Sequence, residues 1–242
     1  MRGLFVTGTD TEVGKSVVAA SICAALAARG ERVAAFKPVV TGLDEEPGEF
    51  GRDHELLAAA ANAGQSPSDV TPHTFGPAVS PHLAAEMAGT TLEPRELVEA
   101  AREQARAAGV EVRAAGEVAA AEPAGDGVLV CEGVGGLLVP ITPGYLVRDL
   151  AIDLALPVVV AARPGLGTIS HTLLTVEAAR AGGLTVAAVV MTPWPDDPSP
   201  MERSNRDTIA RLGDVNVMGL PRTTPGGLAE AGAELPVEEW VR

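Results

Sequence analysis

The chain opens with Leu4-Phe5-Val6-Thr7-Gly8-Thr9-Asp10-Thr11-Glu12-Val13-Gly14-Lys15-Ser16, an apolar strand pattern that runs through a short loop into a helix start. This order is typical of a phosphate-binding loop, in which backbone N–H groups of the loop and of the helix N-terminus meet phosphate oxygens. In that interpretation Lys15 reaches the β- and γ-phosphates and the Ser16 hydroxyl is a ligand of Mg²⁺. The spacing departs from the usual motif, because five residues separate Gly8 from Gly14. The alternative is an ordinary strand-to-helix turn with a capping glycine and a chance Lys-Ser pair.

Apolar segments alternate with helix-like segments along the rest of the chain. Continuous apolar runs such as Val158-Val159-Val160-Ala161-Ala162 are typical of strands buried on both faces, as in a parallel sheet covered by helices. We therefore predict a single doubly wound α/β domain over residues 1–242, with a mostly parallel central sheet and the phosphate loop after its first strand. The expected strands are residues 4–8, 32–36, 128–131, 157–162, 184–191 and 215–220, and the expected helices are residues 14–29, 53–62, 147–154, 168–181 and 201–212. Residues 107–126 have no firm turn signal, and no role is assigned to them.

The composition excludes several classes of partner. A net charge of −14 and a pI near 4.7 disfavour both nucleic acid and anionic lipid, because neither binds without clustered cations. No apolar run approaches the roughly 20 residues that span a bilayer, and no basic leader precedes the first strand. We therefore expect a cytoplasmic protein with no membrane partner. Cys23 and Cys131 lie in apolar stretches without metal-type spacing, so we expect them to be small buried hydrophobes.

The two lysines of the chain mark the region of interest. Of the 18 basic residues, only Lys15 and Lys37 are lysines, and the other 16 are arginines. A compact ammonium differs from a planar guanidinium in size, hydration and reach. In a chain that otherwise uses arginine, these two positions indicate sites where only a point charge fits.

Polar side chains follow two of the predicted strands and open one predicted helix. Lys37 comes directly after strand 32–36, Glu132 ends strand 128–131, and Asp53 opens helix 53–62. Ligands of doubly wound sheets bind beyond the carboxyl ends of the strands, and a carboxylate there can hold the Mg²⁺ that bridges β- and γ-phosphate oxygens. The alternatives are a solvated surface lysine at position 37, a solvated acid at Glu132 and a simple N-cap at Asp53.

Five motifs in chain order resemble the dethiobiotin synthetase family. They are Gly8-Thr9-Asp10-Thr11-Glu12-Val13-Gly14-Lys15-Ser16, Lys37-Pro38-Val39-Val40-Thr41-Gly42, Ser80-Pro81-His82, Glu132-Gly133-Val134-Gly135-Gly136 and Gly165-Leu166-Gly167-Thr168-Ile169-Ser170-His171. The resemblance covers most of the chain and weakens in residues 107–126 and after about Thr192. It implies a homodimeric ligase of biotin biosynthesis that uses Mg²⁺ and acts on 7,8-diaminononanoate, CO₂ and ATP. One amine captures CO₂ as a carbamate, the carbamate attacks the γ-phosphate, and the second amine displaces phosphate to close a cyclic urea.

The resemblance also implies roles for single residues. The catalytic set comprises Lys15, Lys37 and Thr11, and the metal set comprises Ser16, Asp53 and Glu132. The nucleotide-binding set comprises Glu12, Val13, Gly14, Lys15, Ser16, Val17, Thr192 and Pro221. The substrate-binding set comprises Thr41, Gly133, Val134, Gly135 and Gly136, with Gly144, Leu146 and Asn205 as candidates for the substrate carboxylate. The family commonly has an asparagine where this chain has Thr192, so we expect other nucleoside triphosphates to replace ATP.

Three other functions fit parts of the pattern. Partitioning or switch ATPases share a related loop but carry an extra lysine five positions before the motif lysine, where this chain has Asp10. An amidotransferase-linked ligase of cobyrinic-acid type would need a following glutaminase domain, for which this chain ends too early. A bare nucleotide-binding module would bind nucleotide without turnover.

Overall fold

Six strands form the central sheet in the order β10-β9-β8-β1-β5-β2, and all of its neighbouring pairs are parallel. The structure is a computed structural model that describes residues 1–111 and 127–241, so most of the stretch 107–126 lies outside the described residues. The strands are β1 (Gly3–Gly8), β2 (Arg32–Phe36), β5 (Gly127–Gly136), β8 (Val158–Ala162), β9 (Val186–Trp194) and β10 (Val217–Pro221). The predicted doubly wound α/β fold with a mostly parallel sheet is confirmed.

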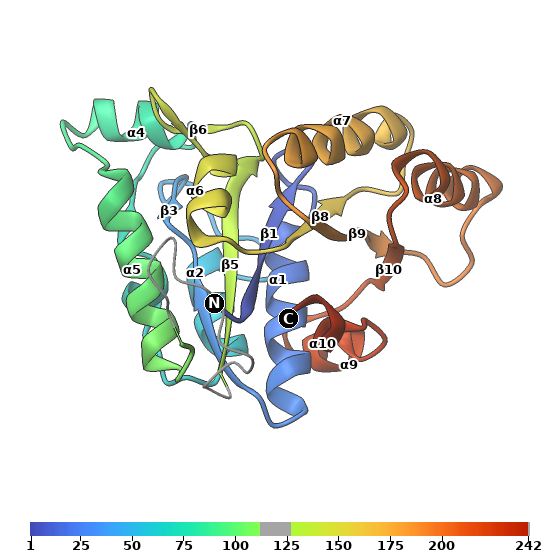
Figure 1. Cartoon of the computed structure of the whole chain (residues 1–242), viewed down its shortest axis with the longest axis horizontal. Coiled ribbons are helices and arrows are strands. Elements are labelled where there is room, and N and C mark those ends of the chain that lie inside the picture. The colour runs from blue at the N-terminus through green and yellow to red at the C-terminus, as the bar shows by residue number, and fades with distance from the viewer. Residues whose placement is uncertain (112–126, 242) are drawn as a thin grey trace.

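Helices cover both faces of this sheet (Figure 1). The helices are α1 (Lys15–Ala28), α2 (Asp53–Ala60), α3 (Pro67–Val70), α4 (Pro81–Met87), α5 (Pro94–Ala107), α6 (Val147–Leu154), α7 (Thr168–Ala181), α8 (Pro200–Gly213), α9 (Leu228–Gly232) and α10 (Val237–Trp240). A short 3₁₀ turn at Pro225–Gly227 precedes α9. Each of the five predicted helices is present, with ends that differ from the prediction by at most two residues.

Alternate residues of β1 enter two separate hydrophobic cores. Phe5 packs in the core that includes residues of α5, α6 and α7, whereas Leu4 and Val6 pack in the core that includes α1, α2, α9 and α10. Successive side chains of a strand point to opposite faces of the sheet. A strand whose two faces are both covered by helices must therefore be apolar at every position. This explains the continuous apolar runs in the sequence.

Two small sheets lie outside the central one. Strands β3 (Val39–Val40) and β4 (His73–Thr74) pair in parallel, and β6 (Pro140–Thr142) forms an antiparallel hairpin with β7 (Tyr145–Leu146). Both are too short to show a period-two pattern, so the sequence did not predict them.

Two predicted strand ends are wrong. Strand β5 does not end at Glu132 but continues to Gly136, and β9 does not end at Met191 but continues through Thr192 to Trp194. In both places the backbone pairing extends past the apolar run, since Gly8 pairs with Gly136 and Pro221 pairs with Trp194 after a register shift. Hydropathy detects the buried part of a strand but not its exposed or glycine-rich continuation. Among the described residues, no helix is both long and apolar enough to cross a membrane.

Candidate active site

The loop between β1 and α1 has the backbone of an anion-binding turn. Gly14 is the N-cap of α1 with φ 88°, and Glu12 also has a positive φ of 55°. Lys15 is buried, and its Nζ donates a hydrogen bond of 2.7 Å to the Asp10 carbonyl oxygen. The loop is therefore folded around its own lysine at the start of a helix with 14 residues.

A cavity of about 380 Å³ lies beside this loop. It brings together segments that are far apart in the sequence: the loop, the ends of β2 and β3, the start of α2 and the end of β5. The sequence-predicted residues that line it are Thr11, Glu12, Gly14, Lys15, Ser16, Val17, Lys37, Thr41, Asp53, Val134 and Gly135. Val13 differs, because its side chain is buried in the core that contains α1.

Lys37 contacts two carboxylates, of which Asp53 lines this cavity and Glu132 does not. Its Nζ lies 2.5 Å from Asp53 Oδ2 and 2.6 Å from Glu132 Oε1. Ser16 Oγ donates a 2.8 Å hydrogen bond to the same Glu132 Oε1. Lys37 and Glu132 are both buried, so the alternatives of a solvated lysine and a solvated acid are wrong.

The charges of this cluster depend on each other. Burial alone would lower the pKa of Lys37, but Asp53 and Glu132 beside it raise that pKa above its ordinary value. Burial opposes ionisation of Asp53, but Lys37 lowers its pKa to about 2. Burial raises the pKa of Glu132, whereas burial followed by repulsion from Lys37 lowers the pKa of Lys15 to about 8. An ammonium at position 37 is therefore stable while Asp53 is ionised.

The donor set Ser16, Asp53 and Glu132 fits a Mg²⁺ ion. All three supply oxygen, which is the ligand atom that Mg²⁺ prefers. Glu132 Oε2 is buried and has no hydrogen-bond partner among the described residues, which leaves an acceptor available in a place where an unpaired oxygen is costly. Arg52 occupies the N-cap position of α2, so the alternative N-cap role for Asp53 is wrong.

The glycine-rich end of β5 is only partly open to the cavity. Val134 and Gly135 line it. Gly133 instead faces packed side chains, because a Cβ there would come within 2.7 Å of Val147 and 3.1 Å of Phe5. Gly136 lies against the backbone of the phosphate loop, with Gly8 O at 3.6 Å from an ideal Cβ. Among these four residues, the backbone of Val134 and Gly135 is the part that a ligand in the cavity can reach.

The three candidates for the substrate carboxylate lie outside the lining of this cavity. The Leu146 amide at the start of α6 donates to Asp149 Oδ2 at 2.8 Å. The Asp149 carboxylate therefore already occupies the amide that the substrate carboxylate was predicted to use. Asn205 is buried in α8, and its Nδ2 donates to the carbonyl oxygens of Pro164 (2.9 Å) and Gly165 (3.2 Å). Gly144 lies in the β6–β7 turn, where a Cβ would meet no atom within 4 Å.

A second cavity, of about 620 Å³, follows the ends of β9 and β10. Pro221 and Trp194 line it. Thr192 is not in its lining but packs against the phosphate loop, because a Cβ at Gly14 would come within 2.5 Å of Thr192 Cγ2. Of the two residues predicted to lie near the nucleotide base, Pro221 therefore lines the second cavity, whereas Thr192 contacts the loop.

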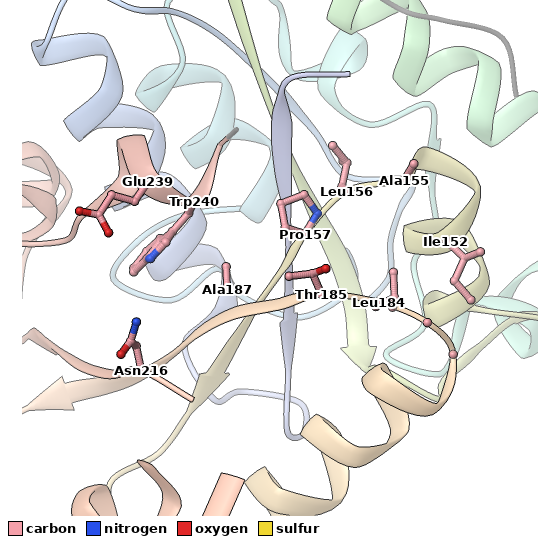
Figure 2. Close-up of a pocket in the computed structure, with 12 residues that line it drawn as sticks. Ile152, Ala155, Leu156, Pro157, Leu184, Thr185, Ala187, Asn216, Glu239 and Trp240 are labelled. Atoms are coloured by element: carbon pink, nitrogen blue, oxygen red, sulfur yellow. The ribbon is translucent and has the colours of Figure 1, made fainter. Parts of the chain in front are cut away.

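A third cavity is remote from this chemistry. Its volume is about 640 Å³, and Figure 2 shows Leu156, Pro157, Leu184, Asn216 and Trp240 around it. It lies at the amino ends of β8 and β9, opposite the edge that carries the phosphate loop. Glu239 is the one titratable side chain in its described lining.

Sequence reasoning missed two arginines that hold backbone carbonyl oxygens near the site. Arg52 donates to Gly42 O (2.9 Å), Leu43 O (2.9 Å) and Glu45 O (2.5 Å), which fixes the segment after Thr41 against the start of α2. Arg163 donates to Glu12 O from Nε (3.2 Å) and Nη2 (2.9 Å). In a chain rich in arginine, neither residue stands out by composition; only the position of Arg163 directly after β8 could have indicated it.

The fold and this site define a P-loop nucleotide-binding protein of the doubly wound α/β class. The family described as AAA domain matches residues 2–223. An ATP-dependent dethiobiotin synthetase BioD of Anaeromyxobacter dehalogenans is 41% identical over 212 residues, which cover 88% of this chain and 86% of the relative. The enzyme of the same name from Bacillus subtilis is 33% identical, with 91% and 87% covered. The chain belongs to the ATP-dependent dethiobiotin synthetase family.

A solved structure gives independent information on the fold. The ParA family ATPase from Chlorobium tepidum has a TM-score of 0.50 and 11% identity, and the match covers 99% of this chain and 96% of that one. At this identity the likeness shows a shared fold alone. The sequence relatives, and Asp10 in place of a second loop lysine, separate this chain from the partitioning ATPases.

Proposed function

We propose that residues 1–242 form one ligase domain that converts 7,8-diaminononanoate, CO₂ and ATP into dethiobiotin, ADP and phosphate, with Mg²⁺, in the cytoplasm. The observation that carries this proposal is the contact of Lys37 with Asp53 and Glu132 beside the phosphate loop, in a chain of the dethiobiotin synthetase family. The net charge of −14 argues against nucleic acid and anionic lipid as partners.

The proposed reaction has three steps. One amine of the substrate attacks CO₂ and loses a proton, which gives a carbamate. A carbamate oxygen then attacks the γ-phosphorus while the bond to the leaving ADP oxygen breaks. The second amine attacks the carbonyl carbon of this carbamic-phosphoric anhydride and loses a proton, inorganic phosphate leaves, and the cyclic urea closes.

The side chains of this chain supply charge and position to those steps. Lys15 and Lys37 stabilise negative charge on the transferred phosphoryl group and on the carbamate, and Thr11 and Thr41 hold the carbamate region. Phosphoryl transfer depends mainly on positioning and electrostatic stabilisation, so no nucleophilic side chain is needed. Both lysines are buried, and charges act more strongly in a buried site than in bulk water.

Ser16, Asp53 and Glu132 would hold the metal ion. When bound, Mg²⁺ supplies positive charge that neutralises the β- and γ-phosphate oxygens. The unpaired Glu132 Oε2 supports this assignment, because an acceptor in that environment is otherwise left unsatisfied.

The nucleotide and the diamine would occupy opposite sides of the phosphate loop. Residues 12–17 bind the phosphates, and the base lies toward Thr192 and toward the second cavity, which Pro221 lines. The diamine lies against Thr41 and against the backbone of Val134 and Gly135, the part of residues 133–136 that lines the cavity. Its carboxylate extends toward Gly144, Leu146 or Asn205, of which Leu146 and Asn205 would have to exchange the hydrogen bonds described above.

A homodimer is the proposed assembly. Exposed large apolar side chains on α7, on α8 and in the loop before α7 support it: Leu166, Leu174, Met201 and Leu212. A second copy would cover part of such a surface. Sedimentation equilibrium at micromolar concentration tests this point, and a monomer at all concentrations contradicts it.

The function is tested by measuring product. Phosphate release from ATP and Mg²⁺ is followed with and without diaminononanoate plus bicarbonate, and dethiobiotin is identified by mass spectrometry. We expect release only with the complete mixture, in equal amounts of phosphate and dethiobiotin. Nucleotide binding without dethiobiotin formation would contradict the proposal and would support the alternative of a module that binds nucleotide without turnover.

A further inference from the structure

Arg163 is the first residue after β8, the strand that pairs with β1. Gly8 at the end of β1 pairs with Ala161, and the Thr9 amide donates to Ala161 O at 3.0 Å. The backbone of β8 therefore already supports the beginning of the phosphate loop. The Arg163 side chain extends this support to the middle of the loop, where Nε and Nη2 both donate to Glu12 O.

Glu12 has a backbone conformation that its side chain does not favour. Its φ of 55° is in the left-handed region, in which a residue with a Cβ is disfavoured unless the surroundings hold it there. Residues 13 and 14 follow directly, so the direction of their amides depends on this turn. The two donors of one planar guanidinium on a single carbonyl oxygen fix that oxygen in direction as well as in distance.

The loop carbonyls are held in a pattern that suits an anion site. Lys15 binds Asp10 O and Arg163 binds Glu12 O. In a concave loop of this kind the amides converge on the anion while carbonyls turn away from it. Cations that fix the carbonyls therefore leave the amides directed at phosphate.

Arg163 does this from outside the cavity. The described residues that line the cavity with Lys15, Ser16 and Lys37 do not include Arg163. We propose that Arg163 is a positioning residue, which holds Glu12 in the left-handed conformation and thereby preorganises the phosphate loop for a nucleoside triphosphate. This inference rests on the proposed nucleotide-binding function of the same loop.

The test is a double-mutant cycle between Arg163→Ala and Glu12→Gly, with MgATP binding measured by calorimetry in the absence of diamine. Glycine adopts the left-handed conformation without steric cost, so the loop of Glu12→Gly should need the guanidinium less. We expect Arg163→Ala to weaken MgATP binding about tenfold in the native background, and less than about threefold in the Glu12→Gly background. Arg163→Lys keeps the charge with a single donor group and should recover part of the loss.

Arg29→Ala is the matched control. Arg29 is also an exposed arginine that donates to backbone carbonyl oxygens, those of Ala233 (2.8 Å) and Leu235 (3.3 Å), but on the C-terminal segment. Its removal should leave MgATP affinity unchanged. In turnover, Arg163→Ala should raise the KM for ATP while kcat at saturating ATP stays within about twofold, because the remaining contacts still orient bound nucleotide.

Three results would overturn the proposal. The first is an equal loss in both backgrounds, which would mean that Arg163 acts by charge alone. The second is a fall in kcat with unchanged MgATP affinity, which would mean direct contact with reacting groups. The third is native MgATP affinity in Arg163→Ala. If the unmodified protein turns over diaminononanoate while the cycle shows no coupling, the positioning role fails and the proposed function stands; if it binds no MgATP, both fail.

Discussion

Lys37 Nζ lies 2.6 Å from Glu132 Oε1, and neither side chain is more than 4% exposed. The same ammonium contacts Asp53, which is 42% exposed as a side chain. Lys37 therefore contacts both the buried carboxylate (Glu132) and the partly exposed carboxylate (Asp53) of the predicted metal set. A buried carboxylate without this partner would favour its neutral form, so the charge of Lys37 also sets the state of the residues around it.

The first prediction is that Lys37→Arg lowers kcat by about 10²–10³-fold, the range for loss of one charge-stabilising group. A planar guanidinium is larger and directs its donors along a fixed fork, so it cannot take the place of an ammonium between two carboxylates. Single-turnover phosphate release at saturating ATP measures the effect. MgATP affinity and the melting temperature are recorded beside it, because a folded variant that binds nucleotide but turns over at the native rate removes Lys37 from the mechanism.

The second prediction is that Asp53→Asn and Glu132→Gln raise the Mg²⁺ concentration needed for half-maximal rate. An amide oxygen is a weaker ligand for this ion than a carboxylate, and each change also removes one partner of Lys37. Titration of Mg²⁺ against rate at fixed ATP is the measurement.

Glu31→Gln serves as the control for that titration. Glu31 pairs with Arg2 at 2.7 Å, away from the phosphate loop, so its loss should change stability slightly and the Mg²⁺ requirement not at all. If Asp53→Asn behaves like Glu31→Gln, then Asp53 is not a metal ligand, and its contact with Lys37 is structural.

The sequence was sufficient for the sheet and for the phosphate loop because both have strong local signals. Six apolar runs matched six strands, and a glycine-lysine-serine sequence after the first run identified the loop. The order β10-β9-β8-β1-β5-β2 depends on contacts between distant segments, which no local pattern contains. Glu132 was recognised by the apolar run before it. The glycine-rich residues 133–136, with which β5 continues, could not be distinguished from a loop.

The surroundings of the site were less predictable for a different reason. Arg163 and Asn205 act on carbonyl oxygens of segments 151 and 41 residues away along the chain. Carbonyl oxygens are present at every residue, so a side chain that binds one has no recognisable partner in the sequence. The family resemblance indicated a substrate contact for Asn205, whereas the structure gives its amide two backbone partners.

The third prediction follows from that contact. Asn205→Ala should lower the free energy of unfolding by about 1–3 kcal/mol, because the carbonyl oxygens of Pro164 and Gly165 lose their shared donor. If the Asn205 amide also reaches the substrate carboxylate, Asn205→Ala raises the KM for the diamine as well as lowering stability. Asn62→Ala is the matched control, since Asn62 likewise bonds only backbone groups in the described contacts, at Val33 N (2.7 Å) and Glu31 O (2.9 Å). A diamine KM that is unchanged in both variants would leave Asn205 a purely structural role.

The last prediction is that the enzyme discriminates weakly among nucleoside triphosphates. Thr192 is buried and packs against Gly14 of the phosphate loop. Its hydroxyl is shorter than an amide and carries one donor, so it cannot form the paired hydrogen bonds by which an asparagine would recognise an adenine edge. Pro193, the next residue, has no backbone N–H to offer.

The residues that line the second cavity can contact a nucleotide base by stacking, which depends little on which base is bound. Trp194 lines this cavity, and Arg206 lies 5.4 Å from the centroid of its ring. Stacking on an aromatic ring contributes about 1–3 kcal/mol and tolerates every base, whereas a site that hydrogen-bonds one base can reject the others by several kcal/mol. The phosphate contacts at residues 14–16 do not depend on the base at all. We therefore expect CTP, GTP and UTP to support turnover with kcat/KM within about a hundredfold of ATP.

Measurement of kcat/KM for the four triphosphates at one Mg²⁺ concentration decides this prediction. Thr192→Asn supplies the reverse experiment, because an asparagine would restore a paired donor and acceptor and should increase the preference for ATP. The relevant quantity is the ratio between ATP and the next-best triphosphate, since a general loss of activity from crowding against Gly14 would affect all four equally. A native preference for ATP above about a thousandfold would mean that backbone groups near Pro221 provide the specificity, and that the threonine at position 192 has no effect on base selection.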